Sequence, residues 1–180
     1  MKIIIEGPNG TGKSTFIEKL LRIEAFSGFE IEHTSQYSPN DFKFHSNMIN
    51  MPQDMVFDRF YVGETIYPIL HKRDALMTKS NYESLYRDNR DTFVVFIDAD
   101  YSFICKALKE RGEEIDQDFI NFEKVEFYKA YEALKSIDPH RVFRIKNHLK
   151  GPYKFEGTDS VDFVIENLLL NLDKLRFSDK

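Results

Sequence analysis

The sequence contains a single cysteine, no tryptophan and no long apolar run. Because Cys105 has no second cysteine to join, no disulfide can form within the chain, and zinc sites built from several cysteines are excluded. No stretch reaches the length needed to cross a membrane, and Met1 and Lys2 leave no room for a signal peptide before the first apolar run. We therefore expect a soluble protein that stays in the cytoplasm.

Positive charge is also scarce. The 180 residues include 25 lysines and arginines against 30 aspartates and glutamates, which gives a net charge of −5. Binding to a nucleic-acid polymer needs clustered positive charge, so the composition argues against such a partner. The length suits one compact α/β domain spanning residues 1–180 and is short for two.

The most specific feature is the octapeptide Gly7-Pro8-Asn9-Gly10-Thr11-Gly12-Lys13-Ser14, which matches the pattern G-x-x-x-x-G-K-[ST]. It follows the β-branched run of residues 3–5, and it precedes an apolar spacing typical of a helix from Lys13 to about Ala25. Strand, glycine loop and helix form the context in which this pattern binds phosphates. We predict that the residues from Gly7 to Thr15 bind ATP.

The chemistry of such a loop explains its spacing. Glycines let successive backbone N–H groups point at a polyphosphate, and the helix that follows presents the positive end of its dipole to the same anion. Lys13 is expected to reach the β and γ phosphates, and the Ser14 hydroxyl to complete the coordination of Mg²⁺. ATP and Mg²⁺ are therefore the predicted ligands.

Two later strands end in acidic residues. The pattern of residues 54–60 predicts a short buried strand with Asp58 and Arg59 at its end, and residues 92–98 predict another that ends at Asp98. The carboxyl ends of parallel strands meet at the edge where the glycine loop lies, so Arg59 is placed to grip a phosphate with its planar guanidinium. Asp98 is similar to a Walker-B acid that holds Mg²⁺ through water, or it simply starts the next helix.

The remaining pattern alternates strands and helices. Residues 29–33 and 141–145 predict strands, and an acidic break at 112–118 separates two helical patterns. Helices are expected over residues 41–50 with Asn40 as the cap, 101–111, 119–136 and 161–175, with a frayed end at 176–180. Residues 61–90 are expected to be mainly helical, with a break or kink at Pro68. The polar residues 34–40 suggest a substrate loop over the nucleotide.

With these motifs in view, the chain resembles the thymidylate kinase-like group of P-loop nucleoside and nucleotide kinases. The residues from Glu6 to Thr15 look like that group's phosphate loop, and Asp58-Arg59-Phe60 looks like its Asp-Arg-aromatic motif. Tyr67 falls where the group has a tyrosine, and Arg111-Gly112-Glu113 is similar to the start of its lid. The resemblance implies a three-layer α/β sandwich around a mainly parallel five-stranded sheet, with a short lid at about 111–119.

The resemblance also implies a reaction, the transfer of the ATP γ-phosphoryl group to a deoxynucleoside 5′-monophosphate with Mg²⁺. The implied catalytic residues are Lys13, Asp58, Arg59 and Arg111, and the implied metal ligands are Ser14, Asp58 and Asp98. A homodimer is plausible by the same similarity. Candidate substrate residues are Glu32, Tyr37, Phe42, Phe44, Arg59 and Tyr67, although the aromatic ones, with His45, could equally belong to the core.

Two alternatives remain open. A deoxynucleoside kinase would phosphorylate a nucleoside 5′-hydroxyl, and Glu32 is then the candidate base, whereas Asp58-Arg59-Phe60 replaces the Glu-Arg-Ser that such enzymes typically show. The second alternative is a nucleotide-binding regulatory protein without kinase activity, because the predicted lid has fewer basic residues than the lids of the thymidylate kinase-like group. Only about twenty residues separate the second strand from Asp54, so the group's long base-reading helix has no counterpart.

Overall fold

The computed structural model describes residues 1–34, 41–148 and 158–178. Strands alternate with helices along these residues, as the sequence pattern predicts. The elements in chain order are β1 (Lys2–Glu6), α1 (Lys13–Leu21), the 3₁₀ turn η1 (Glu24–Phe26), β2 (Glu30–His33), α2 (Phe42–Ile49), β3 (Met55–Asp58), α3 (Gly63–Leu70), α4 (Lys79–Asp88), β4 (Thr92–Ala99), α5 (Tyr101–Glu110), α6 (Gln117–Ile137), β5 (Val142–Asn147) and α7 (Val161–Ser178).

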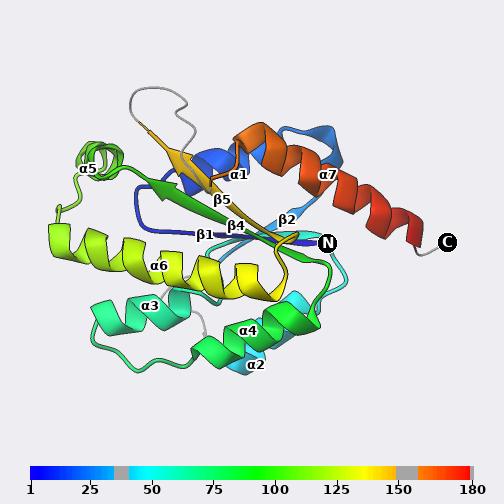
Figure 1. Ribbon diagram of the computed structural model, residues 1–180, viewed down its shortest axis with the longest axis horizontal. Helices are drawn as coiled ribbons and strands as arrows, with labels where there is room; N and C mark the ends of the chain where they lie inside the picture. The colour runs from blue at the N-terminus through cyan, green and yellow to red at the C-terminus, as the bar shows by residue number, and fades with distance from the viewer. Residues whose placement is uncertain (35–40, 149–157, 179–180) are drawn as a thin grey trace.

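In the described part of the chain, the five strands form one sheet in the order β2-β3-β1-β4-β5, and every neighbouring pair is parallel. The predicted α/β class with a five-stranded sheet is confirmed. Helices α1 and α7 cover one face, and α2, α3, α4 and α6 cover the other (Figure 1). Since successive strand side chains point to opposite faces, Ile3 and Ile5 join the α1/α7 core while Ile4 joins the other.

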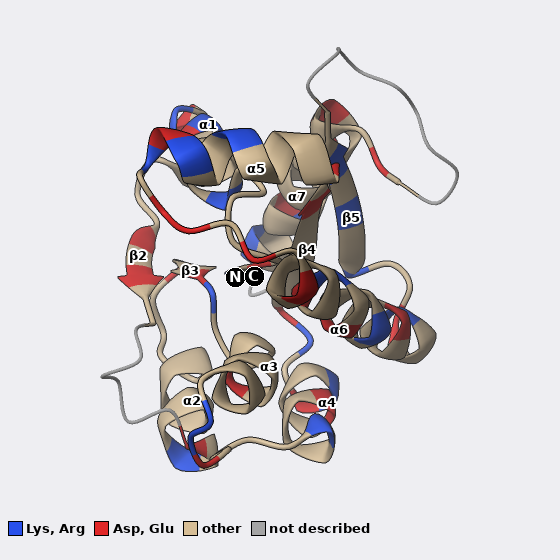
Figure 2. Ribbon diagram, turned by 90° about the vertical axis from the view of Figure 1, so that its left-hand side faces the viewer, with Lys and Arg blue, Asp and Glu red and all other residues tan. Residues whose placement is uncertain are grey.

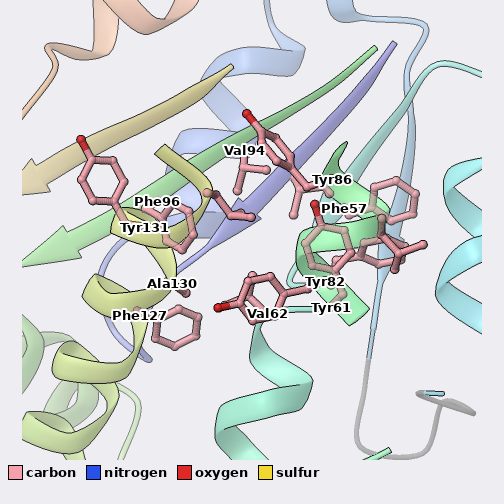
Figure 3. Close-up of a cluster of buried hydrophobic side chains, with 14 of the residues drawn as sticks. Phe57, Tyr61, Val62, Tyr82, Tyr86, Val94, Phe96, Phe127, Ala130 and Tyr131 are labelled. Atoms are coloured by element: carbon pink, nitrogen blue, oxygen red, sulfur yellow. The ribbon is translucent and has the colours of Figure 1, made fainter. Parts of the chain in front are cut away.

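The two cores differ in their chemistry. The core between the sheet and α3, α4 and α6 is rich in aromatic rings, including Phe57, Tyr61, Tyr82 and Phe96 (Figure 3). Tyr61 is fully buried, and its ring stacks on Tyr82 with 6.3 Å between centroids. The core under α1 and α7 is mainly aliphatic. This aromatic packing fixes β3 and the start of α3, the segment that carries Asp58 and Arg59.

Several predicted boundaries shift. The first helix ends at Leu21 instead of Ala25, because the chain then forms the 3₁₀ turn η1. Asn40 lies outside the described residues, and Asp41 caps α2 through a 2.7 Å bond from the Phe44 N–H. Pro68 lies within α3 and does not break it. Helix α7 continues through residues 176–178, which were expected to fray. None of the described helices has the length and hydropathy to span a membrane.

Candidate active site at the carboxyl edge of the sheet

The segment between β1 and α1 curls tightly at the carboxyl edge of the sheet, onto which Figure 2 looks. Gly7, Gly10 and Gly12 all adopt positive φ, at 140°, 74° and 96°. A Cβ on Gly7 would lie 2.1 Å from the Ile97 carbonyl oxygen, so only glycine allows this close packing on β4. No side chain caps α1 at Gly12. The first N–H groups of α1 are therefore left for an anion.

Two hydrogen bonds hold the loop in this shape. The Thr11 hydroxyl donates to the Pro8 carbonyl at 2.9 Å, and the Asn147 amide donates to the Thr11 carbonyl at 2.7 Å. Asn147 ends β5, so the last strand of the sheet anchors a loop that belongs to the first helix. The spacing of 136 residues left no local sign of this contact in the sequence.

A cavity of about 640 Å³ opens beside the loop. It brings together the glycine loop, the start of α1, the ends of β2 and β3, and one side of α5. Its described lining consists of Gly10, Thr11, Gly12, Lys13, Ser14, Thr15, His33, Thr34, Asp58, Arg59, Phe103, Ala107, Glu110 and Arg111. Of the predicted catalytic residues, Lys13, Asp58, Arg59 and Arg111 all line this one cavity, together with the Ser14 hydroxyl.

Lys13 is buried, and its ammonium folds back onto its own loop. Nζ donates to the Gly7 and Pro8 carbonyls at 2.8 and 2.7 Å. Burial, followed by the charge of nearby Arg59, lowers the pKa of Lys13 to about 7. Lys13 and Arg59 thus lie close enough for their charges to repel, an arrangement that a nearby anion would stabilise.

Arg59 follows β3 in a left-handed conformation, with φ at 64°. Its N–H donates to the Ile5 carbonyl at 2.9 Å, and its carbonyl accepts from the Thr34 hydroxyl at 2.8 Å. The guanidinium donates to the Asn9 side-chain oxygen and lies 5.3 Å from the Tyr67 ring centroid. Arg59 therefore extends from the end of β3 to the phosphate loop.

Asp58 has a neighbour that the sequence did not suggest. Its carboxylate lies 3.0 Å from Nδ1 of His33, at the end of the adjacent strand β2. His33 lines the cavity, whereas Glu32, the predicted base, is half-buried on β2 and is not part of the described lining. The alternation of side chains along β2 sends these two residues to opposite faces, and the pairing of β2 with β3 brings His33, and not Glu32, beside Asp58.

Glu123 is another residue that was not singled out. It comes from α6, is 1% exposed, and accepts from the Asn9 backbone and side-chain N–H groups at 3.4 Å. Burial raises the pKa of Glu123, against the lowering influence of Tyr67, Lys13 and Arg59. A carboxylate at a helix position that otherwise faces the core is the signal that could have identified it.

Asp98 is placed differently from the prediction. Its carboxylate pairs with the Arg144 guanidinium at 2.9 Å and with Lys124 Nζ at 3.4 Å, and it is not part of the described lining of the large cavity. Two cations, one from β5 and one from α6, therefore engage this carboxylate. Asp98 as a metal ligand beside Ser14 and Asp58 stays a prediction.

The predicted substrate aromatics are scattered. Tyr37 lies outside the described residues, Phe42 is 39% exposed, and Phe44 packs against the His45 ring. Neither Phe42 nor Phe44 belongs to the described lining of the cavity. Tyr67 is buried under the Arg59 guanidinium. Arg111 lines the cavity from the end of α5 while paired with Glu113 at 2.9 Å.

Comparisons with known proteins bear on the fold. No protein-family model matches the chain, and a search of curated proteins found no match. Among solved structures, the YorR protein of Bacillus subtilis, in complex with phosphorylated GDP, is 19% identical with a TM-score of 0.61 over 98% of both chains. Deoxyadenosine kinase from M. mycoides, with dCMP and dCDP, is 16% identical with a TM-score of 0.54 over 97% of this chain and 100% of that one.

A third similar structure is polyphosphate kinase 2 from Arthrobacter aurescens, 14% identical with a TM-score of 0.58 over 97% of this chain and 68% of that chain. At these identities the similarity concerns the fold. The chain shares the fold of these three structures, two of which are kinases, and has the glycine loop between its first strand and first helix. Membership of the P-loop kinases, and a thymidylate kinase-like identity among them, stay predictions.

Proposed function

We propose that the protein transfers the γ-phosphoryl group of ATP to a deoxynucleoside 5′-monophosphate. The observation that carries this proposal is the convergence of Lys13 and Arg59, from different elements, on one cavity with the Ser14 hydroxyl and the Asp58 carboxylate. Phosphoryl transfer between two anionic groups needs positive charge at both, and little covalent chemistry from the protein. Lys13 and the loop N–H groups hold the donor phosphates, and Arg59 holds the acceptor phosphate.

Magnesium fits the donors at this site. The Ser14 hydroxyl and the Asp58 carboxylate offer hard oxygen ligands to the cavity. The described residues include no group of three or more histidines, cysteines or acids that would hold a metal alone. We therefore expect Mg²⁺ to be held by Ser14, Asp58 and the phosphate oxygens of ATP together. The metal supplies charge neutralisation on the β and γ phosphates.

The adenine base has a neighbouring place. A second cavity of about 210 Å³ shares Gly12, Thr15 and Phe103 with the first and is lined mainly by apolar groups such as Phe16 and Ile145. We expect the base and ribose to occupy it while the phosphates follow the loop. Arg111, beside the first cavity on the segment between α5 and α6, is then placed to approach the migrating phosphoryl group when this segment closes.

A deoxynucleoside acceptor is the second candidate, favoured by the His33–Asp58 pair. A nucleoside 5′-hydroxyl must lose a proton as it attacks, whereas a monophosphate is already anionic. His33, oriented by Asp58 at 3.0 Å, is a candidate to accept that proton. This pair takes the role that the sequence suggested for Glu32.

The test is an ADP-release assay with Mg-ATP and a panel of deoxynucleosides and their 5′-monophosphates. We expect stimulation by at least one monophosphate. Turnover with nucleosides alone would select the second candidate, and ADP release that no compound stimulates would contradict both.

Two variants test which substrate Lys13 and Arg59 each act on. Lys13→Ala should lower kcat by about 10³, the scale of one lost transition-state donor. Arg59→Ala should raise the acceptor KM by about 10- to 100-fold, equivalent to one charge-assisted hydrogen-bonded contact of 1.5–3 kcal/mol, with little change in the ATP KM. Arg87→Ala is the matched control, because Arg87 is an exposed arginine of α4 outside the described lining of the cavity. An Arg59→Ala variant that behaves like Arg87→Ala would remove Arg59 from acceptor binding.

A further inference from the structure

Glu6 is a fully buried carboxyl that the mechanism above does not use. It is the last residue of β1, directly before the phosphate loop, and 0% of it is exposed. A buried carboxyl is costly unless its oxygens are hydrogen-bonded. Its contacts therefore show what the fold gains by keeping it.

The hydrogen bonds that Glu6 accepts from described residues all come from the segment that follows Arg59, and its carboxyl also interacts with the charge of Lys13. Oε1 accepts the backbone N–H groups of Phe60 and Val62, each at 3.1 Å. Among the described residues, no hydrogen bond of normal geometry reaches the other oxygen, Oε2, although the Gly63 N–H lies near enough to favour the charged carboxylate. One oxygen thus binds two successive donors of the turn that joins β3 to α3.

That turn is strained at Arg59. A φ of 64° is rare for a residue with a side chain and costs about 1 kcal/mol or more, so it persists only where neighbours over-determine it. Two further bonds act on Arg59 itself, from its N–H to Ile5 and from Thr34 to its carbonyl. Those two bonds hold the residue in place, and Glu6 fixes the residues just after it.

We infer that Glu6 is a positioning residue whose Oε1 sets the direction of Arg59 relative to the phosphate loop. The inference rests on the proposed function for the role of Arg59. In this role Glu6 contacts neither substrate directly. Its charge is not needed, because a neutral acceptor oxygen at the same place serves equally well. Glu6 lies at the junction of β1 and the loop, so this one side chain fixes the position of the acceptor site relative to the donor site.

The inference predicts an unusual order of variants. Glu6→Gln keeps an acceptor oxygen at the right distance and should leave the acceptor KM within about threefold of wild type. Glu6→Asp keeps the charge but withdraws the oxygens by one methylene, so the acceptor KM should rise at least tenfold while the Kd for Mg-ATP changes less than threefold. A general base or metal ligand would show the opposite order, with Asp tolerated and Gln inactive. Glu64→Asp, which shortens a buried carboxylate paired with Arg73, is the matched control.

A double variant tests whether Glu6 acts through Arg59. With Arg59→Ala already present, adding Glu6→Asp should raise the acceptor KM no further, because the group being positioned is gone. Independent, multiplied effects in the double variant would overturn the inference.

A readout that does not need turnover separates this inference from the proposed function. The Phe60 and Val62 amides should lose at least tenfold of their hydrogen-exchange protection in Glu6→Asp and keep it in Glu6→Gln. If wild type shows no acceptor-stimulated ADP release, the proposed function fails, and the amide protection still decides whether Oε1 holds the turn. Unchanged protection in Glu6→Asp overturns the inference whatever the activity.

Discussion

Gly7→Ala should destabilise the fold far more than the same substitution at Gly28 or Gly112. Gly7 has φ of 140°, a region essentially restricted to glycine, and its added Cβ would lie 2.1 Å from the Ile97 oxygen and 3.1 Å from the Ile97 carbonyl carbon. The obstacle is the backbone of β4, which cannot rotate away like a side chain. Backbone strain of about 1–3 kcal/mol and an overpacking cost of similar size give an expected loss of about 4 kcal/mol in the free energy of unfolding.

Two other glycines separate strain from overpacking. Gly112 has a positive φ of 71°, but no atom of the described residues lies within 4 Å of its added Cβ, so Gly112→Ala should cost about 1 kcal/mol from strain alone. Gly28 has neither feature, and Gly28→Ala should change stability by less than about 0.5 kcal/mol.

Urea unfolding of the three variants at 25 °C measures these differences. With a slope of about 2 kcal/mol per molar urea, Gly7→Ala should lower the midpoint by about 2 M, and Gly112→Ala by about 0.5 M. Binding of Mg-ATP should also be weakened in Gly7→Ala, since the loop has to move away from β4. If Gly7→Ala proved no less stable than Gly112→Ala, the close packing of the loop on Ile97 would be wrong.

Three further predictions follow from the charges and buried polar groups. Burial and then the charge of Arg59 lower the pKa of Lys13 to about 7, whereas bound phosphates favour the charged form of this lysine. ATP binding should therefore take up a proton, and the Kd for ATP should rise by up to tenfold per pH unit above 7. Calorimetry in buffers of different ionisation enthalpy measures both effects. Asp98→Asn should lower the free energy of unfolding, measured in urea, by about 2 kcal/mol and leave the Kd for Mg-ATP unchanged. A large loss of Mg²⁺-dependent affinity for ATP would instead support Asp98 as a metal ligand. Burial lowers the pKa of His45 to about 4, so the unfolded chain binds more protons between pH 4 and 6.5 and stability falls as the pH drops through that range. His45→Leu should remove this dependence and raise stability by about 1 kcal/mol, because neither ring nitrogen has a hydrogen-bond partner among the described residues. Urea unfolding at pH 5 and 8 would contradict this if the variant still lost stability at the lower pH as wild type does.

The fold and the position of the glycine loop between β1 and α1 could be predicted because their signals are local. Buried parallel strands read as continuous apolar runs, and the loop pattern needs only eight consecutive residues. The strands predicted at 29–33, 54–60, 92–98 and 141–145 all appear, within about two residues at most ends. Boundaries were less accurate where a local turn competes with the helix, as at η1 after Leu21.

Long-range partners could not be predicted in this way. Glu6 bonds to residues 54 and 56 positions away, and Asn147 to one 136 positions away. Such contacts depend on which strands become neighbours, and the sequence pattern of each strand alone carries no record of that order. The sequence shows the acidic residue Glu6 directly after the apolar run Ile3–Ile5, but it does not show the hydrogen-bond partners of Glu6.

The two acidic strand ends show why strand order matters for chemistry. Asp58 and Asp98 follow similar apolar runs, and β3 and β4 are both neighbours of β1. Beyond β3 lies β2, which brings the His33 imidazole to Asp58 and leaves that carboxylate at the cavity. Beyond β4 lies β5, which brings Arg144 to Asp98, and α6 adds Lys124. A metal ion at Asp98 would have to displace two cations, whereas the described ion-pair partner of Asp58 is the His33 imidazole alone. The order of the sheet therefore leaves Asp58, and not Asp98, in the lining of the large cavity.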